Sequence, residues 1–157
     1  MAFFALCLSV ASVAAGDDRY GYKIVSTESD FESVLFELKN AIVDRGLVVD
    51  YEGKLNTMLE RTSEAASSVT AEGQKSPYLS ARFLQFCSAK LTHEVISANP
   101  RNISICPYVV FIYEARSKPG VINVGYRKPI GDRSKVSRKA LAKVEALLEN
   151  VIADAVK

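Results

Sequence analysis

The most hydrophobic stretch of the chain after its first fifteen residues reads ISICPYVVFIYE and spans residues 103–114. Within it, residues 109–113 are apolar or aromatic at every position, so an extended chain would bury both of its faces there. Such a run is typical of a strand in the middle of a sheet. We therefore expect residues 103–114 to form the central strand of the fold.

The residues that follow predict a hairpin and a long helix. Residues 117–120 read Ser-Lys-Pro-Gly, which is turn chemistry, and residues 121–126 are rich in strand formers. The two strands should therefore pair in an antiparallel hairpin. From about Ser134 onwards apolar residues recur on one broad helical stripe, which predicts a helix that covers one face of the sheet.

The residues before the central strand predict further strands and helices. Strand formers and alternating patterns predict strands at residues 20–26, 47–51 and 79–87. Helical spacing of apolar residues predicts helices at residues 31–45, 54–68 and 90–98. For the first helix, Ser29 and Glu32 have the spacing of a capping box, and Gly46 suits the position after the helix end. We expect an α+β fold: a single compact domain with a mixed sheet of about five strands packed against helices.

The composition is that of an ordinary globular protein and excludes an obvious polyanion binder. The chain has 157 residues, which suits one domain with one core. Lys and Arg total 20 against 18 for Asp and Glu, so the net charge is only +2. A balance this small gives no long-range attraction for nucleic acid, which is therefore disfavoured as a partner.

The first fifteen residues resemble a secretory signal peptide. They carry no charge, contain Phe and Leu, and end in the small residues Ser12, Val13, Ala14 and Ala15. An apolar stretch of this length is shorter than the roughly 20 residues that span a bilayer, so we expect no stable membrane span. The prediction is a signal peptide at residues 1–15, cut before Ala15 or Gly16, and a single domain at residues 16–157. The mature protein would be periplasmic or secreted.

Cysteine usage points to a disulfide or a thiol pair. Cys7 would leave with the signal peptide, so the mature chain would keep Cys87 and Cys106. In an oxidising compartment a disulfide is the simplest interpretation of two cysteines, and two buried free thiols are the other structural interpretation. A redox-active or ligand-binding thiol pair is the alternative, and Pro107 directly after Cys106 suits it, whereas the absence of a Cys-x-x-Cys spacing does not.

His93, the only histidine, is a candidate third ligand beside the two cysteines. Two sulfurs and an imidazole would suit copper or zinc, so a metal site at Cys87, His93 and Cys106 is the alternative to a protein with no cofactor. A histidine on a short helix is more often simply exposed. No Ser or Asp constellation accompanies His93, so hydrolytic catalysis has no support in the sequence.

A cluster of basic residues follows the predicted hairpin. Residues 127–143 contain seven basic residues and one acid, Asp132. Cations at a helix amino terminus oppose the helix dipole unless an anion binds there. A solvated face is the other interpretation. The candidate anion-binding residues are Arg127, Lys128, Arg133, Ser134 and Lys135.

Several segments of the chain resemble the DUF302 family, whose function is unknown. The resemblance rests on residues 31–46 with Leu47-Val48-Val49 after them, on Phe86-Cys87-Ser88-Ala89, and on residues 102–114. It covers roughly residues 20–127 and implies a compact α+β domain that is capable of dimerising. Where the family commonly has Cys-Asn-Pro, this chain has Cys87-Ser88-Ala89, which places any role of that asparagine in question.

These observations favour an uncharacterised envelope domain that binds a small ligand or a protein partner without catalysis. The candidate ligand-binding residues are Cys87, Cys106, Pro107, Tyr108 and His93. The alternative class is a thiol-based redox enzyme, or a copper or zinc carrier of the cell envelope, that acts through Cys87 and Cys106. The expected partners are an unknown small ligand, an envelope protein, or a second copy of the chain in a homodimer.

Overall fold

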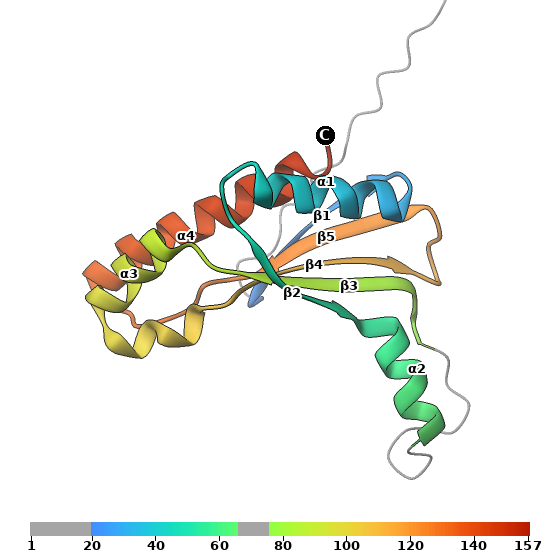
Figure 1. Cartoon of the computed structure of the whole chain (residues 1–157), viewed down its shortest axis with the longest axis horizontal. Coiled ribbons are helices and arrows are strands. Elements are labelled where there is room, and N and C mark those ends of the chain that lie inside the picture. The colour runs from blue at the N-terminus through green and yellow to red at the C-terminus, as the bar shows by residue number, and fades with distance from the viewer. Residues whose placement is uncertain (1–19, 66–75) are drawn as a thin grey trace, which may run out of the picture.

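The computed structural model describes residues 20–65 and 76–157, which form one α+β domain (Figure 1). Five strands form one sheet in the order β1-β5-β4-β3-β2. The strands are β1 (Tyr22–Glu28), β2 (Val49–Lys54), β3 (Tyr78–Phe86), β4 (Tyr108–Ala115) and β5 (Val121–Arg127). The helices are α1 (Phe31–Val43), α2 (Leu55–Ala65), α3 (Ala89–Ala98), the 3₁₀ helix η1 (Pro100–Ile105) and α4 (Lys135–Asp154). The expected fold class and number of strands are confirmed.

The sheet is antiparallel throughout, so the expectation of a mixed sheet is wrong. All four neighbouring strand pairs run antiparallel. The alternation of strands and helices along the chain suggested a parallel neighbour pair, and β1 and β2 do run in the same direction. They lie at opposite edges of the sheet, however, because the hairpin of β4 and β5 and then β3 lie between them.

β4 is the central strand, as expected, although it begins at Tyr108 and not at residue 103. Residues 100–105 form η1 instead, and the side chain of Asn99 accepts a hydrogen bond from the Arg101 amide at its start. Pro107, which has no amide hydrogen to donate, separates η1 from the strand. The hairpin with β5 is also confirmed, with Ile112 opposite Val124.

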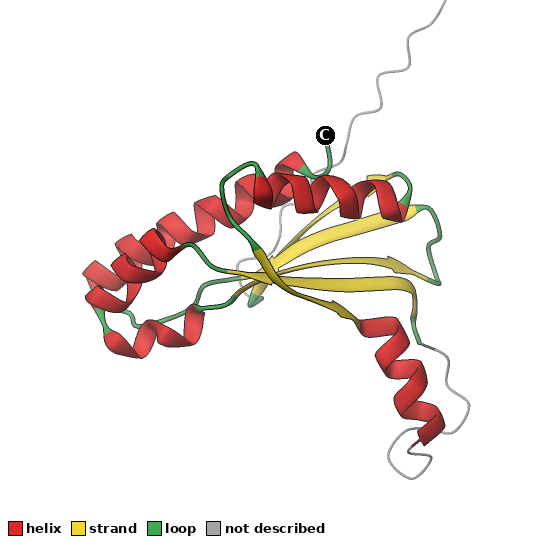
Figure 2. Cartoon of the chain, in the orientation of Figure 1, coloured by secondary structure: helices red, strands yellow, loops and turns green. Residues whose placement is uncertain are grey.

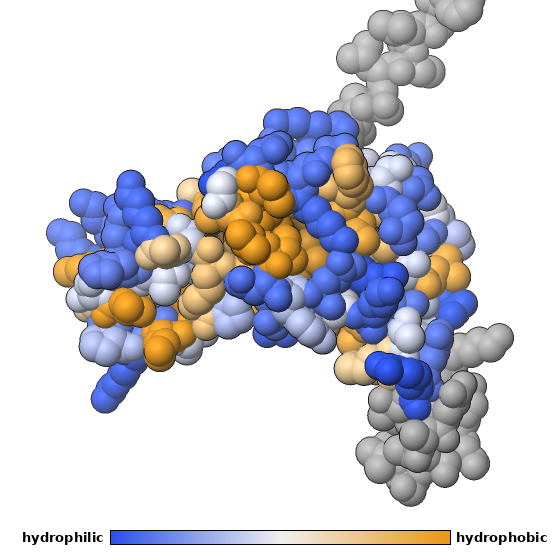
Figure 3. Space-filling model, in the orientation of Figure 1, coloured by the Kyte–Doolittle hydropathy of each residue, from blue (hydrophilic) through white to orange (hydrophobic). Residues whose placement is uncertain are grey.

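α1 and α4 lie side by side on one face of the sheet, whereas α2 projects away from its end (Figure 2). Between α1 and the sheet lies the core, which contains Leu38, Ile42, Val110 and Ile112. Apolar surface also gathers in the middle of the molecule as seen in Figure 3, around the connection between α1 and β2. Among the described residues no helix is long and apolar enough to cross a membrane. The predicted signal peptide at residues 1–15 lies outside the described residues.

The ends of the helices follow local sequence rules, with one correction. The side chain of Asp30 accepts a hydrogen bond from the Ser33 amide at 2.9 Å and caps α1, so the predicted capping box of Ser29 and Glu32 is wrong. Aspartate is as good an N-cap as serine and stands one residue closer to the helix. Gly46 adopts φ of 71° after the helix, the left-handed conformation predicted for it. The last helix, predicted from about Ser134, begins at Lys135 with Ser134 as its N-cap.

Asn102 joins four elements through a buried side-chain amide. Its Nδ2 donates to the carbonyl oxygen of Val95 on α3 and to Oγ of Ser137 on α4, each at 3.0 Å. Its Oδ1 accepts from the amide of Asp132 in the loop between β5 and α4, at 2.9 Å. A side chain at Gly131 would place its Cβ only 2.6 Å from that oxygen, so glycine is required there. Asn102, only 1% exposed, thus fixes η1 against α3, α4 and the loop.

The first prediction concerns this amide. We expect Asn102→Ala to lower the free energy of unfolding by about 2 to 3 kcal/mol, because it removes three hydrogen bonds of a buried side chain and leaves a cavity in its place. Urea unfolding measures the difference. Asn150→Ala, on the exposed side of α4, removes the same side chain where it has no such role and should change stability by less than about 0.5 kcal/mol. Equal effects of the two variants would contradict this account.

Candidate functional site

A disulfide between Cys87 and Cys106 closes the connection between β3 and β4. Cys87 directly follows β3, and Cys106 lies between η1 and Pro107. Their Cα atoms are 6.1 Å apart, and the two residues are 19 positions apart in the sequence. A disulfide that closes a loop of this length stabilises the folded state by about 3 kcal/mol, because it lowers the conformational entropy of the unfolded chain. The disulfide therefore closes the loop that leaves the sheet after β3, contains α3 and η1, and returns to the sheet at β4.

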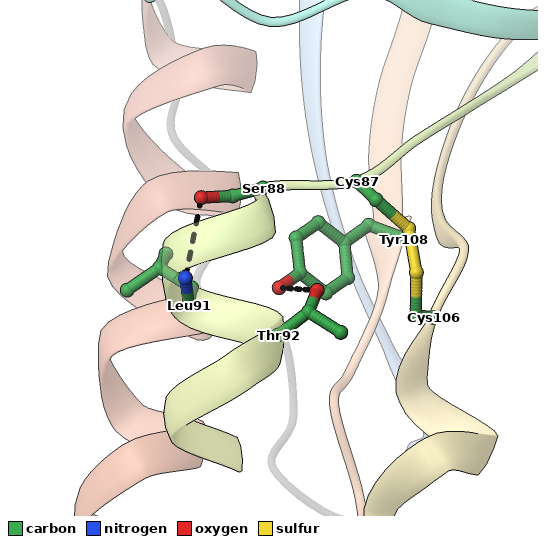
Figure 4. Close-up of a disulfide and its surroundings, with 6 residues drawn as sticks. All are labelled: Cys87, Ser88, Leu91, Thr92, Cys106 and Tyr108. Carbon is green, nitrogen blue, oxygen red and sulfur yellow. Dashed lines mark hydrogen bonds between the residues drawn. A yellow bond between two sulfur atoms is a disulfide. The ribbon is translucent and has the colours of Figure 1, made fainter. Parts of the chain in front are cut away.

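Tyr108 packs beside the disulfide and reaches across to α3 (Figure 4). Its ring meets that of Phe86 edge to face at 5.8 Å, and its hydroxyl lies 3.1 Å from Oγ1 of Thr92. Burial raises the pKa of Tyr108, an effect that the hydrogen bond with Thr92 partly offsets. The hydroxyl therefore stays protonated at neutral pH, and its place in the structure is to anchor α3 to the start of β4.

A cavity of about 150 Å³ lies at this end of the sheet. It brings two sets of predicted residues together: Pro107 and Tyr108 from the start of β4, and Arg127 and Lys128 from the end of β5. The hairpin register explains the meeting, because Val110 pairs with Tyr126 and the residues outside that pair come to lie opposite one another. The residues around the cavity are Ser104, Ile105, Pro107, Tyr108, Val109, Arg127, Lys128, Pro129, Ile130 and Leu148.

The other predicted anion-binding residues do not line this cavity. Ser134 uses its Oγ to accept a hydrogen bond from the Ser137 amide at 3.2 Å, while Arg133 and Lys135 are exposed. The helix end has an anion of its own, because the carboxylate of Asp132 accepts from the Ser134 amide at 3.1 Å. The structure thus divides the predicted set into Arg127 and Lys128 at the cavity and three residues at the start of α4.

His93 lies at a groove between α3 and α4. It is exposed on α3, with Nδ1 3.4 Å from Oγ of Ser97, and it borders an open groove of about 500 Å³ against Val136 and Lys139 of α4. Across residues 20–65 and 76–157, no group of three or more His, Cys, Asp or Glu side chains is placed to hold a metal ion. The structure therefore does not assemble the candidate ligands Cys87, His93 and Cys106 into one site.

Sequence reasoning missed Asn102 and Thr92, which hold the walls of this region. Both are ordinary polar residues in the sequence, and only the crossing of η1, α3 and α4 shows what they bind. The one available signal was Asn102 itself, a polar residue beside a hydrophobic run. Ser88, in contrast, caps α3 by accepting a hydrogen bond from the Leu91 amide at 3.4 Å. Asparagine, which the DUF302 family commonly has at this position, is an equally good N-cap, so serine at position 88 keeps the capping role.

Comparison with known proteins supports the fold and leaves the function open. No family model matches the chain, and no curated protein matches it. A solved structure that is similar to it is that of an uncharacterized conserved protein, DUF302, from Bacillus stearothermophilus. The match has a TM-score of 0.69 and covers 86% of this chain and 98% of that one, at 13% sequence identity. The chain thus has a DUF302-like fold.

The second prediction concerns acid stability at the start of α4. Hydrogen bonds from the side chains of Ser134 and Ser137 and from the Ser134 amide lower the pKa of Asp132 to about 2. A carboxyl with a depressed pKa contributes stability above its unfolded value, and that contribution is lost as pH falls from about 4 to 2. Asp132→Asn should therefore lower Tm at pH 7, and its difference from the wild type should disappear near pH 2. A deficit of the same size at both pH values would refute a role for the ionised carboxyl.

Proposed function

We propose that this chain is an exported envelope domain that binds a small anionic ligand in the cavity between the start of β4 and the end of β5, without catalysis. The observation that carries the proposal is that Arg127 and Lys128 border the same cavity as Pro107 and Tyr108. The uncharged first fifteen residues support export, and a disulfide suits an oxidising compartment.

The size and polarity of the cavity suit a small anionic group. A volume of about 150 Å³ is comparable to a cavity that takes up benzene, so a phosphate or a small carboxylate would fit. Ile105, Val109 and Leu148 make part of the wall apolar, which strengthens the attraction between an anion and the basic side chains. Charge-assisted hydrogen bonds from a guanidinium are the strongest polar contacts such a ligand can receive.

The chemistry of the wall favours binding over catalysis. Among the described residues that line the cavity there is no carboxylate, imidazole or thiol. Tyr108 is the one lining phenol, and its hydroxyl is engaged by Thr92. General acid–base catalysis needs a group that changes protonation near neutral pH, and burial moves the pKa of Tyr108 in the wrong direction.

The third prediction tests the cavity with two probes, inorganic phosphate and acetate. We expect each to shift the NMR signals of the Val109 and Leu148 methyl groups. Arg127→Gln should weaken binding at least about tenfold, because it removes a charge-assisted hydrogen bond. Arg133→Gln removes the same charge from an exposed position outside the cavity and is the matched control.

Two outcomes would overturn the cavity assignment. If both variants weaken binding equally, the probes respond to the general charge of the basic cluster and not to the cavity. If neither probe shifts the Val109 and Leu148 signals of the wild-type protein, the cavity does not bind small anions.

A thiol-based redox enzyme or metal carrier is the second candidate function. It is favoured by the exposure of the disulfide, because Cys87 and Cys106 are both only half-buried. In this alternative the reduced pair would exchange electrons with a partner, or would bind copper or zinc together with a further ligand.

The fourth prediction separates the two functions in protein purified from the envelope fraction. Intact mass should show a chain that begins at Ala15 or Gly16 and is two hydrogen masses lighter than its sequence. A structural disulfide should stay oxidised in glutathione buffers, with a potential below about −300 mV. The second candidate requires instead a pair that equilibrates near about −200 mV, or reduced protein that takes up one copper or zinc ion per chain. Uncut protein in the cell interior would contradict export.

A further inference from the structure

Most of the residues around the cavity between the start of β4 and the end of β5 are apolar. Six of its ten lining residues have hydrocarbon side chains, namely Ile105, Pro107, Val109, Pro129, Ile130 and Leu148. Val109 and Leu148 are almost fully buried, whereas Ile130 is 67% exposed, so this apolar wall extends from the core to the surface. A ligand in the cavity therefore meets mostly hydrocarbon side chains.

The backbone of the wall offers few hydrogen-bond donors. Pro107 and Pro129 have no amide hydrogen. The Lys128 amide donates to the carbonyl oxygen of Gly21, and the Ile130 amide donates to the carbonyl oxygen of Lys128, each at 2.9 Å. Phosphate groups usually take hydrogen bonds from several free backbone amides at once. The wall is therefore a poor site for phosphate.

Arg127 is the donor that remains for an anion. Among residues 20–65 and 76–157 its guanidinium makes no hydrogen bond or ion pair. A guanidinium presents two parallel N–H groups, which match the two oxygen atoms of a carboxylate. The Tyr108 hydroxyl, in contrast, is already engaged with Thr92 at 3.1 Å. One unoccupied guanidinium beside an apolar wall favours an anion with a single carboxylate and a hydrocarbon body.

We propose that the ligand of this cavity is a monocarboxylate with a short hydrocarbon body. This inference rests on the proposed function and names the class of anion. The carboxylate accepts two hydrogen bonds from Arg127, and the hydrocarbon body lies against Val109, Ile130 and Leu148. The volume of about 150 Å³ is that of a cavity that takes up benzene, so the body has about four to six carbon atoms.

The fifth prediction compares isovalerate with acetate, inorganic phosphate and isovaleramide at pH 7. Isovalerate should bind at least about tenfold more tightly than acetate, because each buried methylene group contributes about fourfold in affinity. Isovaleramide has the same hydrocarbon body without the charge, and it should bind at least about tenfold more weakly than isovalerate, as should phosphate. The NMR signals of the Val109 and Leu148 methyl groups measure all four affinities.

Two matched variants test the hydrocarbon wall. Ile130→Ser shortens an exposed side chain of the wall and should weaken isovalerate binding at least about threefold without changing that of acetate. Ile103→Ser, at a 69% exposed isoleucine on η1 outside the cavity, is the control and should change neither. Arg127→Lys keeps the charge but removes the paired N–H groups, so it should weaken isovalerate binding more than phosphate binding.

The outcomes distinguish the class of ligand from the proposed function. If phosphate or acetate binds as tightly as isovalerate, the cavity binds small anions without recognising a hydrocarbon body, so the inference fails and the proposed function stands. If no probe shifts the methyl signals, or if isovaleramide binds as tightly as isovalerate, both fail. Equal effects of Ile130→Ser and Ile103→Ser on isovalerate binding would overturn the contact between the ligand and the apolar wall.

Discussion

β4 is apolar on both faces, and among residues 20–65 and 76–157 the helix layer of α1 and α4 covers only one of them. Val110 and Ile112 point into the core under α1 and α4, while Val109, Phe111 and Tyr113 point the other way. A strand with apolar residues on both faces is typical of the middle of a sheet, and β4 has two strands on either side of it. The same run therefore leaves Phe111 and Tyr113 on the face of the sheet opposite α1 and α4.

The end of the sheet near Tyr108 is held by three links of different kinds. The Cys87–Cys106 disulfide closes the loop between β3 and β4. The hydroxyls of Tyr108 and Thr92 join the start of β4 to α3, and Asn102 joins η1 to α4. None of these links would fix the geometry alone, because each restrains a different element. Together they make a rigid wall of residues 104–109, against which the end of β5 places Arg127 and Lys128. A preorganised wall lowers the entropic cost of binding a small ligand there.

Local patterns in the sequence predicted most of the helices and strands. They did not predict which elements from distant parts of the chain come into contact. The two-sided apolar run, the Pro119-Gly120 turn and the start of the last helix near Ser134 each depend on neighbouring residues, and all three are present in the structure. The expectation of a mixed sheet was wrong because the order of strands and helices along the chain does not determine which strands become neighbours in the sheet. The basic cluster was divided for a similar reason, since only the hairpin register brings Arg127 to Pro107. Asn102 was missed because its three partners come from three separate segments.

The two edge strands of the sheet, β1 and β2, run in the same direction. If sheets joined edge to edge by simple translation, β1 of one molecule would have to pair in parallel with β2 of the next, the less stable mode of pairing. A bulge between Val49 and Tyr51 further interrupts the free edge of β2. Continuous ribbons of this protein are therefore disfavoured by its strand order, which protects a concentrated solution of the folded chain from fibre growth.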